Sequence, residues 1–376
     1  MIINYKLNIY LEMTTIIFTR YLYNADEVLL TFLECLLTAK NLEECYFWIY
    51  EYYISGFEQE SWDFIWKIYY DFYALSYPKM ERKIKQYYKL WKNDKQFINI
   101  MHIVKNFFRF SFSSNSCIFM LRIYYYKRLF KLLDKIEEKE IKYDCKNKYQ
   151  SLLIQSILEK EFENMAYYLK RCINDKNIIE LLEYVFEKKI FLNEYYDNKF
   201  HQLLAKIIQK KRNIEYNLNY YYKKASQKEY DMVLKTDESC RKGRLEDVSY
   251  VYTTLKKRRI YGISSKIGCF TLKRQNIDLH NIFWHHWEYY AYFSPLWKKR
   301  FLKNDIHIDH EQKKIIFNNV DEEEEFYEEY GYEPDEQSKE IQEKSIIEIP
   351  NNKLDNWLNG IFIGHISRKI RTKIIY

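Results

Sequence analysis

The residues best suited to chemistry in this sequence are histidines in its last third. His285 and His286 are adjacent, and His307, Asp309 and His310 follow in the next short segment. Imidazole nitrogens and a carboxylate are the ligands that a catalytic zinc ion usually takes. His285, His286, His307 and Asp309 are therefore metal candidates, on the condition that the fold brings the two segments together. The alternative is a set of ordinary polar residues beside an aromatic helix.

No other pattern in the sequence supports an enzyme. Phosphate-binding glycine loops, the nucleophile elbow and the HExxH zinc motif are all absent. Neighbouring acids such as Glu43 and Glu44 point apart on a helix, so they cannot share a proton-transfer task. The seven cysteines include no CxxC pair, which argues against a zinc knuckle and favours a reducing compartment. We expect no cofactor.

Charge is unevenly distributed along a chain whose formal net charge is only +7. Residues 82–131 carry twelve bases and one acid, and residues 241–274 carry ten bases and two acids. Tyrosine and tryptophan residues interleave with both blocks. Because cations neutralise phosphates and rings stack on bases, this combination suits nucleic acid. The predicted contacts are Lys127, Arg128, Lys256, Lys257, Arg258 and Arg259.

Internal neutralisation is the alternative explanation of these blocks. Residues 24–72 carry ten acids against two bases, and residues 321–343 carry twelve acids against one base. Either acidic segment could cover a basic block, or a protein partner could dock there. The sequence leaves these alternatives open.

Dense runs of aromatic residues form the third feature, "CYFWIYEYYISG" at 45–56 and a second run at 62–73. The ring positions recur about every 3.6 residues, as they do on one face of a helix. Glu44 and Glu51 argue against a membrane, and the lack of nearby cations argues against base stacking. Such rings fill the space between packed helices, and an exposed patch of them would bind a protein partner. The predicted partner contacts are Trp48, Tyr52, Tyr53, Trp62, Trp66 and Tyr69.

Long helices are the elements that must position these residues, because only 7 Gly and 4 Pro interrupt 376 residues. Asn24 with Glu27 and Asn41 with Glu44 have the spacing of helix starts. Gly56 occupies a C-cap position, and Pro78 ends a helix. Further helices are predicted over about 79–92, 95–109, 116–139, 145–160, 161–173 and 176–189.

The predicted fold class is mainly α, an irregular helical bundle or an α-solenoid of helix hairpins. The stretch "IHIDHEQKKIIF" alternates in polarity and predicts a β-hairpin in a small C-terminal region. The expected organisation is an N-terminal extension at 1–19, a helical-hairpin domain at 20–240, a basic and aromatic domain at 241–320, a mobile acidic linker at 321–343 and a final segment at 344–376. Met13 is a candidate alternative start. We expect no secretory signal and no membrane span.

The stretches "RYLYNADEVLLTFLECLL", "LEECYFWIYEYYISGF" and "IWKIYYDFYALSYPKM" resemble an uncharacterised protein family of nucleocytoplasmic large DNA viruses of the mimivirus-like kind. The resemblance covers about Arg20 to Met80, and more weakly "FWHHWEYYAYFSPLW". It implies a viral protein made in the host cytoplasm, in a viral factory or a virion. It carries no catalytic residues.

Three functions follow as expectations. The first is a non-enzymatic viral helical scaffold or adaptor that binds a protein partner through the aromatic runs. The second is a nucleic-acid-associated viral factor that uses the blocks at 82–131 and 241–274. The third is a metal-dependent enzyme at the histidines.

Overall fold

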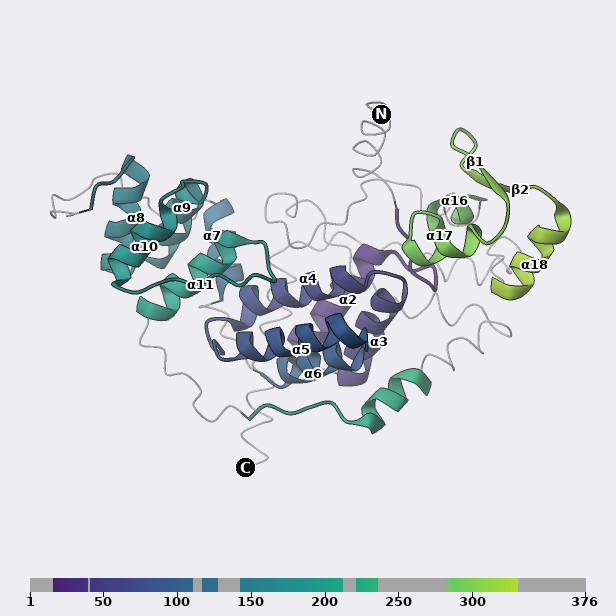
Figure 1. Cartoon of the computed structure of the whole chain (residues 1–376), viewed down its shortest axis with the longest axis horizontal. Helices are drawn as coiled ribbons and strands as arrows, with labels where there is room; N and C mark the ends of the chain where they lie inside the picture. Colours follow the sequence, from purple (N-terminus) through teal and green to yellow (C-terminus); the bar gives the residue numbers. More distant parts are fainter. Residues whose placement is uncertain are drawn as a thin grey trace. The chain divides into compact units, whose positions relative to one another are not determined.

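A computed structural model describes residues 16–39, 41–110, 117–127, 143–211, 221–235, 282 and 285–330, with the backbone alone at 123–127 and 211. The described chain is mainly helical with one small antiparallel hairpin, which confirms the predicted fold class (Figure 1). It divides into two compact units. The first comprises Met1–Ser61, Ile100–Phe108 and Lys224–Tyr376, and the second comprises Trp62–Asn99 and Arg109–Lys223. The predicted domain boundary at 240 lies outside the described residues.

The first unit opens with a tight turn and two packed helices. Phe18 and Asn24 form an antiparallel bridge, and α2 (Ala25–Thr38) and α3 (Leu42–Ile54) follow as a helical hairpin. The side chain of Asn41 caps α3 by accepting from the backbone N–H groups of Glu43 and Glu44, at 2.9 and 3.3 Å. Asn24 stands at the N-cap of α2, but its side chain makes no capping hydrogen bond.

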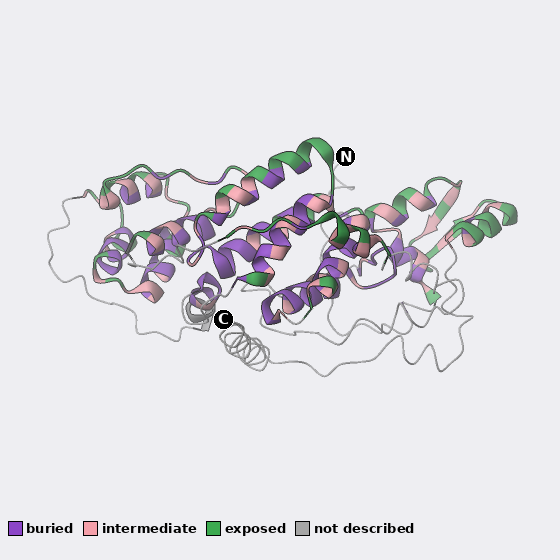
Figure 2. Ribbon diagram, turned by 90° about the horizontal axis from the view of Figure 1, so that it is seen from below, coloured by how far each residue is buried: buried purple, intermediate pink, exposed green. Residues whose placement is uncertain are grey.

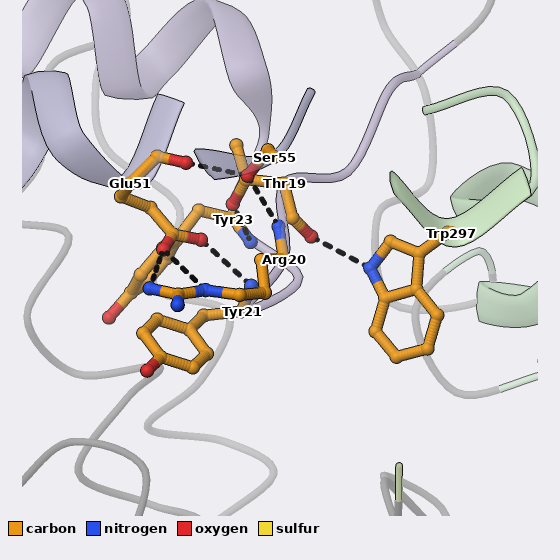
Figure 3. A network of polar contacts seen from close by, with 7 residues as sticks. All are labelled: Thr19, Arg20, Tyr21, Tyr23, Glu51, Ser55 and Trp297. Carbon is orange, nitrogen blue, oxygen red and sulfur yellow. Dashed lines mark hydrogen bonds and ion pairs between the residues drawn. The ribbon is translucent and has the colours of Figure 1, made fainter. Parts of the chain in front are cut away.

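The N-terminal segment is tied into the first unit by the buried polar network in Figure 3. The carboxylate of Glu51 accepts hydrogen bonds from Nη2 and Nε of Arg20, at 2.9 and 3.3 Å, and from the backbone N–H of Tyr21 at 2.8 Å. The indole N–H of Trp297 donates to the carbonyl of Thr19 at 3.0 Å. Ile16 and Phe18 are buried in the same region. The predicted extension at 1–19 therefore overlaps the core from residue 16 onward.

The C-terminal part of the first unit is a compact aromatic module. It contains α16 (Trp287–Ala291), α17 (Pro295–Phe301), β1 (Ile306–Asp309), β2 (Lys314–Phe317) and α18 (Val320–Tyr330). The strands pair antiparallel with Ile308 opposite Ile315, which confirms the predicted hairpin. Pro295 separates the two short helices by acting as the first residue of α17, where its missing N–H costs nothing.

Helix α18 corrects the prediction of a mobile linker at 321–343. Residues 321–330 are helical, and residues 331–343 lie outside the described part of the chain. Phe326 is buried in the aromatic module, and Tyr327 and Tyr330 pack against it, although most of the helix is exposed (Figure 2). These three side chains form an apolar stripe among the acids, and α18 packs against the aromatic module through this stripe.

The second unit consists of helices that pack through aromatic rings. Helix α4 (Glu58–Ile68) begins in the first unit, enters the second at Trp62 and runs into a π-helical turn, η1 (Tyr69–Tyr73). The other helices are α5 (Met80–Asp94), α7 (Ile118–Lys127), α8 (Lys148–Glu159), α9 (Phe162–Cys172), α10 (Ile178–Phe186) and α11 (Lys199–Lys211). Helix α6 (Ile98–Arg109) returns the chain to the first unit over residues 100–108.

Aromatic pairs fill the interior of the second unit. The ring of Trp62 lies 5.2 Å from that of Tyr88 and 5.7 Å from that of Trp91, and both tryptophans are buried. A buried ion pair accompanies them, because Arg122 donates from Nη2 to the Asp71 carboxylate of η1 at 2.8 Å. Rings spaced one helical turn apart thus join helix to helix, as their periodicity predicts.

Candidate polyanion-binding surface

The six rings predicted to contact a partner lie inside the protein. Their exposed fractions range from 0 to 7%, for Trp48, Tyr52, Tyr53, Trp62, Trp66 and Tyr69. They contribute to the helix packing described above, so they form no exposed patch. The pattern correctly indicated an apolar face, but the surface that covers it belongs to this same chain.

The predicted nucleic-acid contacts lie mostly beyond the described residues. Arg128 and the run Lys256, Lys257, Arg258 and Arg259 are outside them, as is the whole block at 241–274. Lys127 is described by its backbone alone, at the end of α7. The structure does describe most of the other basic block, over residues 82–110.

The four predicted metal ligands do not converge on one point. Nδ1 of His286 lies 3.1 Å from the carbonyl of Lys313, and the carboxylate of Asp309 accepts from the N–H groups of its own turn. His307 lies opposite Ile316 on the hairpin, and His285 is exposed. Among the described residues, no three histidine, cysteine or acidic side chains are placed to hold a metal ion.

Helix α5 carries the most concentrated positive charge in the described part of the basic block at 82–131. Its apolar face is buried at Met80, Ile84, Tyr87, Tyr88 and Trp91, which recur at helical spacing. The opposite face and the cap carry six bases, Arg82, Lys83, Lys85, Lys89, Lys92 and Lys95. The burial of one face therefore forces the cations onto the other.

Aromatic rings contact four of these lysines. Their ammonium groups lie over the rings of neighbouring residues at centroid distances of 5.5 Å (Lys83 over Tyr222), 5.7 Å (Lys89 over Tyr195), 5.2 Å (Lys92 over Tyr88) and 3.9 Å (Lys95 over Trp91). A cation is attracted to the face of a ring, and the lysine stem covers apolar surface while the charge stays in water. We call these six bases the row on α5, although at about 100° per residue Lys83 and Lys92 lie on opposite flanks of the helix, with Arg82 and Lys89 between them.

The few acids on α5 leave most of this row without a counter-charge. Glu81 pairs with Lys85 at 3.1 Å, and the carboxylate of Asp94 accepts from the side chain of Asn99 at 2.9 Å. Arg82, Lys83, Lys89 and Lys92 make no ion pair within the described part of the chain. From Arg82 to Lys92 the row spans about 15 Å at the helical rise per residue.

A short segment beside α5 adds a ring that faces water. Tyr222 stacks on Tyr87 of α5, with centroids 5.7 Å apart and planes inclined by 17°. The preceding residue, Tyr221, is 76% exposed. Its backbone carbonyl accepts a hydrogen bond from Nη1 of Arg109 at 3.3 Å. We call the row on α5, with Tyr195, Tyr221 and Tyr222, the lysine–aromatic surface.

This surface suits binding rather than catalysis. It offers cations and rings, and none of its members pairs a nucleophile with a base. Sequence reasoning identified the basic block that contains it but named other residues as contacts. The lysines of α5 could have been found from their position opposite the apolar stripe of the same helix.

Comparison of the chain with protein-family models, with curated proteins and with solved structures finds no match. The resemblance to a viral family therefore stays a prediction. None of the described helices combines the length and apolarity needed to cross a membrane.

Proposed function

We propose that this chain is a non-enzymatic helical protein that binds nucleic acid through the lysine–aromatic surface. The observation that carries the proposal is the row of four cations on α5 without a carboxylate partner among the described residues. Within the described part of the chain, self-neutralisation of the bases from Arg82 to Lys92, the alternative that the sequence left open, is seen only for Lys85, which pairs with Glu81.

The physical basis is counterion release. Phosphates hold a condensed layer of cations, and protein cations that replace this layer gain binding free energy that falls as salt rises. A ring contact worth about 0.5–1 kcal/mol at an exposed site favours some lysine rotamers over others, which reduces the conformational freedom lost on binding. Arg82, Lys89 and Lys92 lie within about a quarter turn of one another over about 15 Å of the helix, a length that covers several consecutive phosphates of an extended strand.

Equilibrium binding tests the proposal. The full chain is titrated into a fluorescein-labelled oligothymidine of about 20 nucleotides, at salt concentrations from about 50 to about 200 mM. We expect affinity to fall steeply with salt, and the Lys89→Glu, Lys92→Glu double variant to reduce the slope of log K against log salt by about 1.4.

The matched control is Lys298→Glu, Lys299→Glu. It makes the same change in net charge at two exposed lysines of α17. We expect the control to bind nearly as the native chain does. Binding that ignores salt, or equal losses in both double variants, would contradict the proposal.

A scaffold that assembles through protein contacts is the second candidate. Its support is a set of exposed apolar side chains in the second unit, Leu158, Tyr184 and Phe191, with Phe191 76% exposed. Sedimentation velocity of the native chain and of Leu158→Ser, Phe191→Ser checks it. Assembly that the double variant abolishes would support a scaffold, and a monomer at all concentrations would count against self-assembly.

The viral setting rests on the sequence resemblance alone. It supports action in the host cytoplasm, at a viral factory or in the virion. Antibody staining of infected cells tests this setting, because signal confined to another compartment would reject it.

A further inference from the structure

Tyr221 has an unusual combination of exposure and restraint. Its ring is 76% exposed, while its carbonyl accepts from Arg109 and its neighbour Tyr222 is stacked on Tyr87. These two contacts hold the backbone at Tyr221 next to α5, so the exposed ring stays near this helix. Positive charge lies over the ring of the next residue, because the ammonium group of Lys83 is 5.5 Å from the centroid of Tyr222.

We propose that the Tyr221 ring stacks on an unpaired base, so that the ligand of the lysine–aromatic surface is single-stranded nucleic acid. This inference rests on the proposed function and adds the class of ligand to it. Cations alone would bind single and double strands alike, since both present phosphates. An accessible ring adds affinity only when a base is free to stack on it, and duplex bases are already stacked on one another.

The exposed ring, rather than charge, favours a nucleic acid over an acidic protein at this site. Aspartate and glutamate side chains would satisfy the lysines but have no aromatic face to stack on the ring, whereas every base has one. The binding affinity therefore has two contributions that can be measured separately, one from the phosphates and one from the bases.

Two probes of equal charge distinguish these parts. The full chain is titrated into labelled oligothymidine and into an abasic oligomer of the same length, which keeps the phosphates and lacks the bases. We expect Tyr221→Ala to weaken oligothymidine binding at least about fivefold and to leave abasic binding unchanged. Tyr221→Phe should bind as the native chain does, because the ring is retained.

Tyr149→Ala is the matched control, because Tyr149 is an exposed tyrosine of the same unit on α8, outside the lysine–aromatic surface. It should leave both affinities unchanged. If Tyr221→Ala changes both probes equally or neither, while the Lys89→Glu, Lys92→Glu variant still weakens both, the stacking inference is overturned and the proposed function stands. If that charge variant changes neither probe, both are overturned. Competition by polyglutamate as strong as that by oligothymidine would also overturn the inference, in favour of an acidic protein.

Discussion

Glu51 is a fully buried carboxylate that accepts from Arg20 and from the backbone of Tyr21. Its replacement by Gln removes the negative charge that offsets a buried guanidinium, while the shape of the side chain is kept. We expect the Glu51→Gln variant to lose about 3–5 kcal/mol of unfolding free energy, as in other broken buried ion pairs. Urea denaturation followed by circular dichroism measures the loss.

The half-buried pair of Glu81 with Lys85 provides the comparison. We expect Glu81→Gln to cost about 0–1 kcal/mol, because water solvates both partners. A similar loss in the two variants would mean that burial does not control the strength of these pairs.

His201 makes the second unit sensitive to acid. It is buried, with Nδ1 2.7 Å from the hydroxyl of Tyr196, and burial lowers its pKa from 6.5 to about 3. Because the unfolded chain binds this proton at a higher pH than the folded chain, stability is full above about pH 6.5 and falls as pH decreases toward 3. Between pH 7 and pH 5 the expected loss is about 2 kcal/mol.

Urea denaturation at these two pH values checks this sensitivity. In His201→Asn the loss of unfolding free energy between pH 7 and pH 5 should be smaller by about 2 kcal/mol. In His307→Asn, which changes an exposed residue of β1, the loss should match that of the native chain. Burial also lowers the pKa of His102 to about 4, so some acid sensitivity should remain in every variant. An unchanged loss in His201→Asn would refute the assignment to His201.

At the scale of elements, the two asparagine caps offer a direct comparison. Both occupy N-cap positions, but Asn41 accepts two backbone hydrogen bonds and Asn24 accepts none as a cap. We expect Asn41→Ala to lower the unfolding free energy by about 1 kcal/mol and Asn24→Ala to lower it by less than about 0.5 kcal/mol. Thermal denaturation of the two variants measures the difference, and equal losses would contradict it.

The helices were the part of the fold that the sequence predicted best. Their apolar periodicity and caps gave the range 145–160 for α8 (Lys148–Glu159) and 161–173 for α9 (Phe162–Cys172). Helix α11 was missed, although its apolar residues also recur at helical spacing. The π-helical turn η1 could not be predicted, because one shifted hydrogen-bond pattern leaves no mark on composition.

The candidate site was harder to predict from the sequence than the helices were. A ring at helical spacing indicates contact but does not say whether the covering surface belongs to this chain or to another, so Trp48 and Trp62 were assigned to a partner. The lysine–aromatic surface depends on Tyr195 and Tyr222, which reach α5 from distant parts of the sequence. Pairings of this kind follow from tertiary structure and not from local pattern.

At the scale of the whole molecule, one core joins the two ends of the described chain. Ile16, Phe18 and Leu22 are buried together with Trp287, Trp297 and Phe326. A chain that stops after residue 284 lacks most of this core. We expect it to expose apolar surface, bind the dye ANS and lose cooperative unfolding of the first unit.

A chain that stops after residue 330 is the control, because it keeps every described member of this core. It should unfold cooperatively and bind little dye. If the shorter chain also unfolds cooperatively, the N-terminal segment does not depend on the C-terminal module.

The hydrogen bond from Trp297 to Thr19 spans 278 positions of sequence. A ribosome that adds roughly 5–20 residues per second needs on the order of tens of seconds to deliver the donor after the acceptor has emerged. During that interval the apolar side chains of the nascent N-terminal segment remain exposed to solvent. The extent of chaperone binding in the cell should therefore depend on translation time rather than on the stability of the folded protein.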